Sequence, residues 1–149
     1  MLLNGRCHCG NIAFTLTWSP TPTVIPARAC TCSFCVKHGG VWTSNPGGAL
    51  RVVVKKPAQL TKYTFGTGQA SFRICSHCGV VPLVTSQIDG KLHAVVSVNA
   101  LEDVDASLIQ RQPTNFDGES VADRVARWQR NWIADVGFVD GDGLAIQVH

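Results

Sequence analysis

Alternation of apolar and polar residues along the first hundred positions predicts a series of short β-strands. In residues 11–17, Ile12, Phe14 and Leu16 share one face of the chain, the two-residue period of a half-buried strand. Further runs predict short strands at residues 50–54, 60–65, 71–74, 80–88 and 91–98, and residues 41–42 form a short apolar piece. This region therefore indicates a mainly β fold.

Turn-forming residues separate these segments. Three prolines within residues 19–26 predict a loop rather than a strand on the way to Cys30. Asp89-Gly90, between the last two expected strands, predicts a hairpin turn because both residues tolerate a positive φ.

The hydrophobic period changes near residue 120, where apolar residues recur at helical spacing. This pattern predicts one helix over about 119–133; its apolar residues are Val121, Val125, Trp128 and Trp132. Ser120 and Asp123 resemble a capping box at its start. We expect the glycine-interrupted tail at 136–148 to add a short strand.

Length and composition narrow the class of protein. The chain has 149 residues, which is a single-domain length, and we expect one domain over 1–149. Its net charge of +3 is too small to indicate a nucleic-acid partner. No apolar run reaches the ~18–20 residues that span a membrane, and the first cysteine leaves no room for an export signal. We therefore expect a soluble cytoplasmic protein with no membrane partner.

Seven cysteines add chemistry to this β chain. They form three groups: Cys7-His8-Cys9-Gly10, Cys30-Thr31-Cys32-Ser33-Phe34-Cys35 and Cys75-Ser76-His77-Cys78-Gly79. An odd number of thiols cannot all form disulfides, and a Cys-x-Cys pair is too tightly tethered for an unstrained one. Thiols at such short spacings in a reducing compartment indicate zinc.

The spacing of the cysteines divides them into two sites. The Cys75/Cys78 pair forms a zinc knuckle, and the Cys7/Cys9 pair supplies two further ligands across 66 residues of sequence. These four cysteines (below, the four-cysteine group) predict a closed structural zinc site.

The remaining thiols (below, the three-cysteine group) are Cys30, Cys32 and Cys35. They fill three corners of a second tetrahedron, so we expect two zinc ions per chain. The fourth corner is either open to a ligand, as in catalytic sites, or closed by His38. Three thiolates neutralise the ion's charge, so an open corner favours a thiol ligand over activated water.

The cysteine pattern resembles that of the glutathione-dependent formaldehyde-activating enzyme family, which includes the zinc domain of centromere protein V. The resemblance covers about residues 5–100 and also includes Gly5, Ser33, Gly39, Pro82 and the segment 98–103. It implies an Mss4-like fold of small coiled antiparallel sheets stapled by zinc. Residues 119–149 are then an addition to the family's domain.

The resemblance also implies a reaction. Cys7, Cys9, Cys75 and Cys78 would hold a structural zinc ion, and Cys30, Cys32 and Cys35 a catalytic one. The activity would be that of a carbon–sulfur lyase acting in reverse, adding glutathione or a similar thiol to formaldehyde or a related aldehyde. After Pro113 the family commonly has a histidine-centred segment, whereas this chain reads Thr114-Asn115-Phe116-Asp117. That difference allows an acceptor larger than formaldehyde.

Several side chains near these motifs have two interpretations. Arg124, Arg127 and Arg130 recur every three residues, which suits either a solvated basic face or a clamp for a carboxylate. Trp42 and Phe34 suit either a pocket wall or the core. His8 and His77 are expected to be solvated turn residues, and His93 a structural one. A zinc-stapled module that binds a protein without turnover is the alternative to an enzyme.

Overall fold

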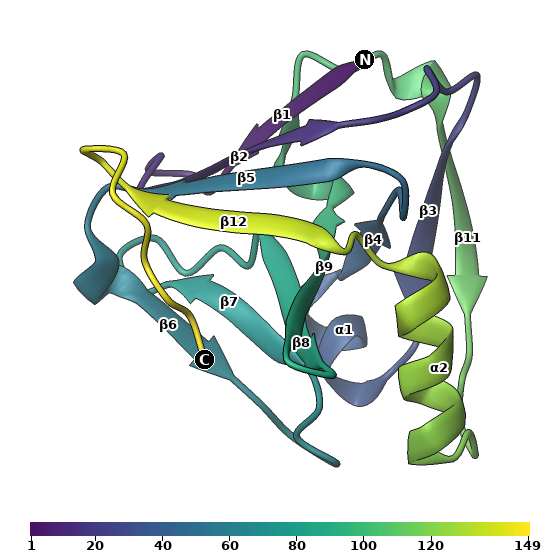
Figure 1. Ribbon diagram of the computed structural model, residues 1–149. Helices are drawn as coiled ribbons and strands as arrows, with labels where there is room; N and C mark the ends of the chain where they lie inside the picture. Colours follow the sequence, from purple (N-terminus) through teal and green to yellow (C-terminus); the bar gives the residue numbers. More distant parts are fainter.

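The alternating segments form strands that assemble into two sheets (Figure 1). The computed structural model describes all 149 residues. The first sheet contains β1 (Leu2–Arg6), β2 (Ile12–Thr17), β5 (Ala49–Val54), β10 (Leu101–Glu102) and β12 (Asp135–Asp140). Its strand order is β10-β1-β2-β5-β12, and only the pairing of β12 with β5 is parallel.

The second sheet has seven strands. They are β3 (Ile25–Cys30), β4 (Val41–Thr43), β6 (Leu60–Tyr63), β7 (Ser71–Cys75), β8 (Leu83–Ile88), β9 (Lys91–Ser97) and β11 (Ile109–Thr114). Their order is β11-β3-β4-β9-β8-β7-β6, with β11 parallel to β3. The helices are α1 (Ser33–His38) and α2 (Val121–Asn131), with single 3-10 turns at Pro57–Gln59, Val98–Ala100 and Ala106–Leu108.

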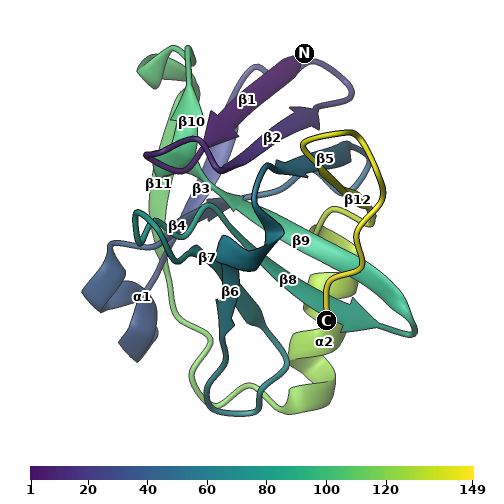
Figure 2. The ribbon, with the colours of Figure 1, turned by 90° about the vertical axis from the view of Figure 1, so that its left-hand side faces the viewer.

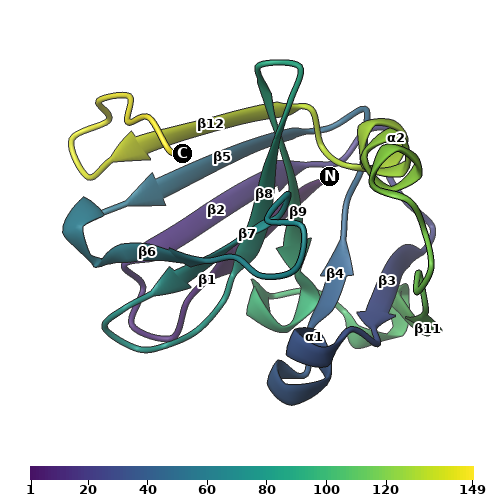
Figure 3. The same ribbon diagram turned by 90° about the horizontal axis from the view of Figure 1, so that it is seen from below.

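The central hairpin of β8 and β9 is buried on both faces. Because successive strand residues point to opposite faces, Leu83, Ala94 and Val96 face the five-stranded sheet and join a core of 17 buried residues. Val84 and Val95 face the other way, into a second cluster that includes the tryptophans of α2. Figure 2 shows the two sheets in the perpendicular view. In Figure 3, both helices lie at the end of the molecule that carries β3, β4 and β11.

The structure confirms the predicted mainly β fold and most of the predicted elements. The hairpin turn is present, with φ of 52° at Asp89 and 76° at Gly90. The helix starts as expected, because the Ser120 hydroxyl accepts from the Asp123 backbone N–H at 3.1 Å. The tail supplies β12, which continues the five-stranded sheet.

Several predictions were wrong or incomplete. Residues 19–26 do not form a loop throughout, because β3 begins at Ile25 and includes Pro26. The proline is tolerated because it lies near the start of the strand, before the residues that pair with β4. A six-residue helix, α1, follows Cys32 and was not predicted. Strands β1, β10 and β11 were also missed. Strand β6 ends at Tyr63 rather than at residue 65, and β8 begins at Leu83 rather than at residue 80.

The last thirty residues are part of the packed structure. Ile133 is fully buried in the large core and exchanges backbone hydrogen bonds of 2.9 Å with Ala94 of β9. Phe138 of β12 joins the same core at 5% exposure. The segment after α2 therefore closes one side of the space between the sheets. No helix in the structure is long and apolar enough to cross a membrane.

Replacing Ile133 with alanine is expected to lower the free energy of unfolding by about 2–5 kcal/mol, because it opens a cavity in the core. Leu144→Ala is the matched control, because that side chain is 65% exposed and should change stability by less than about 0.5 kcal/mol. Urea unfolding followed by circular dichroism measures both. Equal stability of the two variants would show that the C-terminal segment does not support the core.

Candidate active site

The four-cysteine group lies where two turns of similar construction meet. The backbone N–H of Cys7 donates to Ile12 O at 2.8 Å, and that of Cys75 donates to Val80 O at 3.0 Å. Gly10 and Gly79 follow with φ of 83° and 81°, a region that an L side chain rarely adopts. The two turns thereby direct all four sulfurs to within 4.8 Å of one another.

The spacing of these sulfurs fits a tetrahedral metal ion. With zinc–sulfur bonds of ~2.3 Å, the edge of a regular tetrahedron is about 3.8 Å. The sulfurs of Cys7 and Cys9 are 3.7 Å apart, and those of Cys9 and Cys75 are 3.6 Å apart. These separations are far from a disulfide bond of ~2.05 Å. Burial raises the pKa of Cys7 to about 12, so a thiolate at this position needs a compensating cation.

The three-cysteine group is built at the junction of β3 and α1. Cys30 ends β3, Cys32 caps α1, and Cys35 lies in the first turn of that helix. The Cys32 sulfur accepts from the Cys35 N–H at 3.3 Å, and the Cys30 sulfur accepts from the Cys32 N–H at 3.5 Å. Because the helix cap itself is a thiol, the local fold brings the three sulfurs together.

Neighbouring groups tune these thiols. The neighbouring Cys35 thiol lowers the pKa of Cys30 to about 5 despite partial burial. The same contact, together with burial, raises the pKa of Cys35. Trp42 Nε1 donates to the Cys35 sulfur at 3.4 Å and so holds it in place. The group is thus arranged to share negative charge, which suits a cation bound among its sulfurs.

His38 is not among the side chains that converge on the three-cysteine group. It is exposed, and its ring packs on Phe34 with centroids 4.5 Å apart. All three cysteines line a cavity instead. The structure therefore favours an open fourth corner over closure by His38.

This cavity has a volume of about 610 Å³ and is lined by 21 residues. One side is apolar and belongs to the second core cluster; its members are Trp42, Phe72, Val84, Val95, Trp128 and Trp132. The charged residues Arg28, Arg124 and Arg127 also line the cavity. The cavity therefore places apolar surface, positive charge and three thiols around one space.

The parallel pairing of β11 with β3 brings the segment after Pro113 to this cavity. Thr114 lies opposite Cys30 in the register, and the Thr31 hydroxyl donates to Thr114 O at 2.6 Å. Phe116 and Asp117 then line the cavity. The segment that differs from the family pattern is thus part of the candidate site.

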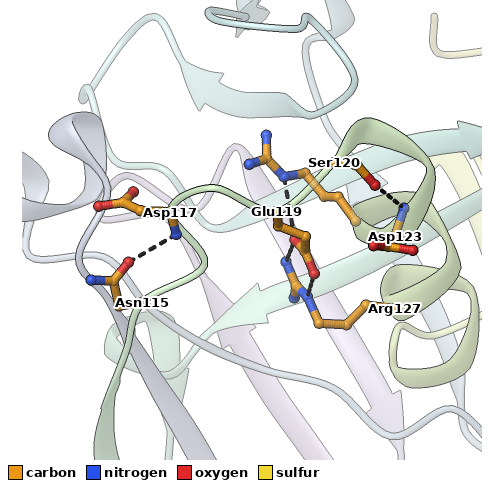
Figure 4. Close-up of polar contacts among 7 residues, drawn as sticks. Asn115, Asp117, Glu119, Ser120, Asp123 and Arg127 are labelled. Carbon is orange, nitrogen blue, oxygen red and sulfur yellow. Dashed lines mark hydrogen bonds and ion pairs between the residues drawn. The ribbon is translucent and has the colours of Figure 1, made fainter.

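Two of the three helix arginines face the cavity and are joined by one carboxylate. Arg127 donates to Glu119 through Nε and Nη2, both at 3.0 Å, and Arg124 Nε lies 3.5 Å from Glu119 (Figure 4). The Arg127 guanidinium also stacks over the Phe116 ring at 3.5 Å. The interpretation of these arginines as a solvated basic face therefore holds only for Arg130, which is exposed.

Arg28 is a site residue that the sequence did not reveal. Its Nη2 donates to Ser44 Oγ at 2.8 Å, and no carboxylate pairs with it. Burial lowers the pKa of its guanidinium, and the nearby charge of Arg127 adds to this effect. Arg28 lies in the segment before Cys30 that was predicted to be a loop, and no alternation of apolar and polar residues there pointed to it.

The structure also places the remaining aromatic and histidine side chains for which the sequence suggested a role. Trp42 both lines the cavity and belongs to the core. Phe34 is not a lining residue; it packs against the same apolar cluster and stacks on Tyr63. His8 and His77 are exposed, as expected for turn residues. His93 is buried, with Nδ1 3.0 Å from Lys91 O, which agrees with a structural role.

The protein thus has two β-sheets, one cluster of four thiols and a second cluster of three thiols that lines a cavity. These features define a class of β-proteins suited to binding zinc. The chain belongs to the glutathione-dependent formaldehyde-activating enzyme family, whose sequence model matches residues 2–115. A crystal structure of a Rhodobacter sphaeroides protein is similar, with 30% identity and a TM-score of 0.58, over 74% of this chain and 99% of that one. No curated protein matches the chain.

We expect Glu119→Gln to destabilise the protein by about 0.5–1 kcal/mol at pH 7, as for partly exposed ion pairs. The arginine contacts hold the pKa of Glu119 below its ordinary value of 4.5. This carboxylate therefore adds stability that is complete above its unfolded-state pKa and is lost as pH falls through the folded-state value.

The measurement is the difference in unfolding free energy between wild type and Glu119→Gln. It should be constant from about pH 5.5 to 7 and shrink below about pH 4.5. Asp123→Asn is the matched control, because its side chain makes no ion pair. A difference that grows on acidification would contradict a stabilising role for Glu119.

Proposed function

We propose that the protein is a zinc-dependent enzyme that adds the thiol of glutathione to formaldehyde or a related aldehyde. One observation carries the proposal: the three-cysteine group opens onto a cavity, and no protein side chain converges on its fourth corner. Family membership supplies the reaction class, because the family is described as glutathione-dependent and formaldehyde-activating.

Two zinc ions per chain fit the thiols. Cys7, Cys9, Cys75 and Cys78 would hold a structural ion, and Cys30, Cys32 and Cys35 a catalytic one. When bound by three thiolates, zinc supplies a fourth coordination position at which a thiol ligand loses its proton. The free thiols also suit a reducing compartment such as the cytoplasm.

The residues around the cavity would bind and orient the substrates. Arg28 carries a positive charge without a carboxylate partner, so it can receive a carboxylate of glutathione. Trp42 holds the Cys35 sulfur, and the capping bonds of α1 hold the sulfurs of Cys30 and Cys32. These contacts keep the thiol group rigid, which favours reaction by positioning.

The reaction itself balances without an added acid or base. The substrate thiol loses a proton, its sulfur forms a bond to the carbonyl carbon, and the π pair of the carbonyl moves to oxygen. The proton then ends on that oxygen, which gives a hemithioacetal. The aromatic and aliphatic side of the cavity limits access of water, which would compete for the aldehyde.

The alternative, a protein-binding module without turnover, has less support. In a binding module, zinc would serve only to stabilise the fold, and its sites would be closed by protein ligands. Closure of the three-cysteine group by His38 would therefore have favoured the module. The three cysteines lining a large cavity favour the enzyme.

Protein purified without chelator should contain two zinc ions per chain by elemental analysis. Cys78→Ser should insolubilise or unfold the protein, because that ligand belongs to a site whose two halves lie 66 residues apart and whose zinc affinity is ~10–16 kcal/mol. Cys32→Ser should remain folded and contain about one zinc fewer. Identical thermal melting of the two variants would contradict a division into structural and catalytic sites.

Exchange NMR of glutathione with formaldehyde tests the activity. The wild-type protein should accelerate formation of the adduct over buffer, and Cys32→Ser should lose at least ~10²-fold of this acceleration. His38→Ala is the control and should retain it, because His38 lies outside the site. No acceleration, together with X-ray absorption of the metal that does not change on adding thiol, would favour the binding module.

A further inference from the structure

The apolar side of the cavity is not explained by glutathione and formaldehyde. Formaldehyde is a one-carbon molecule, whereas the cavity of about 610 Å³ lies within the ~300–1,000 Å³ range of pockets for drug-sized ligands. Glutathione is larger, but its carboxylates, ammonium group and amides need hydrogen-bonding partners. Neither substrate has a group that suits a wall of tryptophan, phenylalanine and valine.

That wall is well defined. Trp128 and Trp132 stack on each other with centroids 4.6 Å apart, and each is only 7% exposed. Opposite them, Val84, Val95 and Phe72 come from the outward face of the seven-stranded sheet. We call these five residues the apolar subsite. Their side chains are held by core packing, so the subsite is formed before a ligand arrives.

Much of this wall lies outside the region that matches the family. The match ends at residue 115, yet six of the 21 lining residues come later in the chain. These six are Phe116, Asp117, Arg124, Arg127, Trp128 and Trp132. The Rhodobacter sphaeroides structure is covered almost completely, whereas about a quarter of this chain has no counterpart in it. The added segment therefore shapes the site beyond what the family domain provides.

The polar residues of the added segment limit where the reacting group can lie. Arg127 lines the same cavity as the three cysteines, and its guanidinium is fixed by Glu119 and Phe116. Charged groups, the three thiols and the apolar subsite thus line one continuous cavity, in which the apolar cluster packs directly against the cysteines. A ligand that reacts at the thiols and fills the cavity has a polar reacting end and an apolar body.

From these observations we infer that the apolar subsite takes an alkyl or aryl group of the aldehyde acceptor, so that the preferred acceptor is a larger aldehyde than formaldehyde. The inference rests on the proposed function for the reaction, and on the cavity alone for the binding of the apolar group. The chemistry is unchanged: the substrate thiol adds to the carbonyl carbon, and its proton ends on the carbonyl oxygen.

Binding is tested without thiol or turnover, using 3-phenylpropan-1-ol as an unreactive analogue of 3-phenylpropanal. Two of the four tryptophans form the subsite, and Trp42 lines the same cavity, so intrinsic fluorescence reports occupancy. The Trp18→Phe variant serves as the background, because Trp18 lies in the other core cluster. We expect a saturable change in fluorescence with a Kd in the low millimolar range or tighter, about the affinity that the ten non-hydrogen atoms of the alcohol can provide. Methanol should cause no change.

A cavity-filling variant and its control identify the binding position. Ala70→Phe places a ring in the cavity, because Ala70 lines it and packs against the apolar cluster. It should weaken binding of the alcohol at least tenfold and lower the ratio of kcat/KM for 3-phenylpropanal over formaldehyde by a similar factor. Ala122→Phe makes the same change at an exposed position of α2 and should alter neither quantity.

The outcomes separate the two proposals. Acceleration with formaldehyde but no fluorescence response to the alcohol would overturn the inference and leave the proposed function standing. Equal binding by wild type and Ala70→Phe would also overturn it. Binding that Ala70→Phe abolishes, with no turnover of either aldehyde, would support the subsite and reject the proposed function.

Discussion

The burial of the β8–β9 hairpin on both faces is the constraint on which the rest of the structure depends. Successive residues of a strand point in opposite directions, so one hairpin can contribute to two separate apolar clusters. Leu83, Ala94 and Val96 support the five-stranded sheet, while Val84 and Val95 face the cavity. A one-residue shift in the register of this hairpin would exchange the two sets and disrupt both core and site.

The two cysteine groups differ both in the number of their thiols and in their surroundings. Both consist of thiols on tight turns stabilised by backbone N–H groups. In the four-cysteine group, Cys7 and Cys75 are fully buried and belong to the large core. The three-cysteine group instead lines a cavity to which arginine and tryptophan side chains also contribute. Packing around each group therefore decides how much open space its thiols face.

The C-terminal segment joins these two parts of the molecule. Ile133 and Phe138 complete the large core, while Trp128 and Trp132, a few residues earlier, complete the apolar wall of the cavity. The helix that carries the tryptophans is held at its start by Ser120 and fixed against the cavity by the Glu119–Arg127 pair. The same short stretch of chain consequently contributes to the large core and to the wall of the cavity.

The sequence by itself determined the features that depend on local chemistry. Two-residue alternation located β2, β5, β8 and β9, helical spacing located α2, and thiol spacing located every member of both cysteine groups. It did not locate β3 or α1, because Pro26 masked a strand whose stability comes from pairing with the distant β11, and because a thiol, Cys32, serves as a helix cap. Only the tertiary structure brought Arg28, Phe116 and the paired tryptophans around the three-cysteine group. Their proximity arises from strand register and from packing between segments up to a hundred residues apart, and no local pattern encodes such contacts.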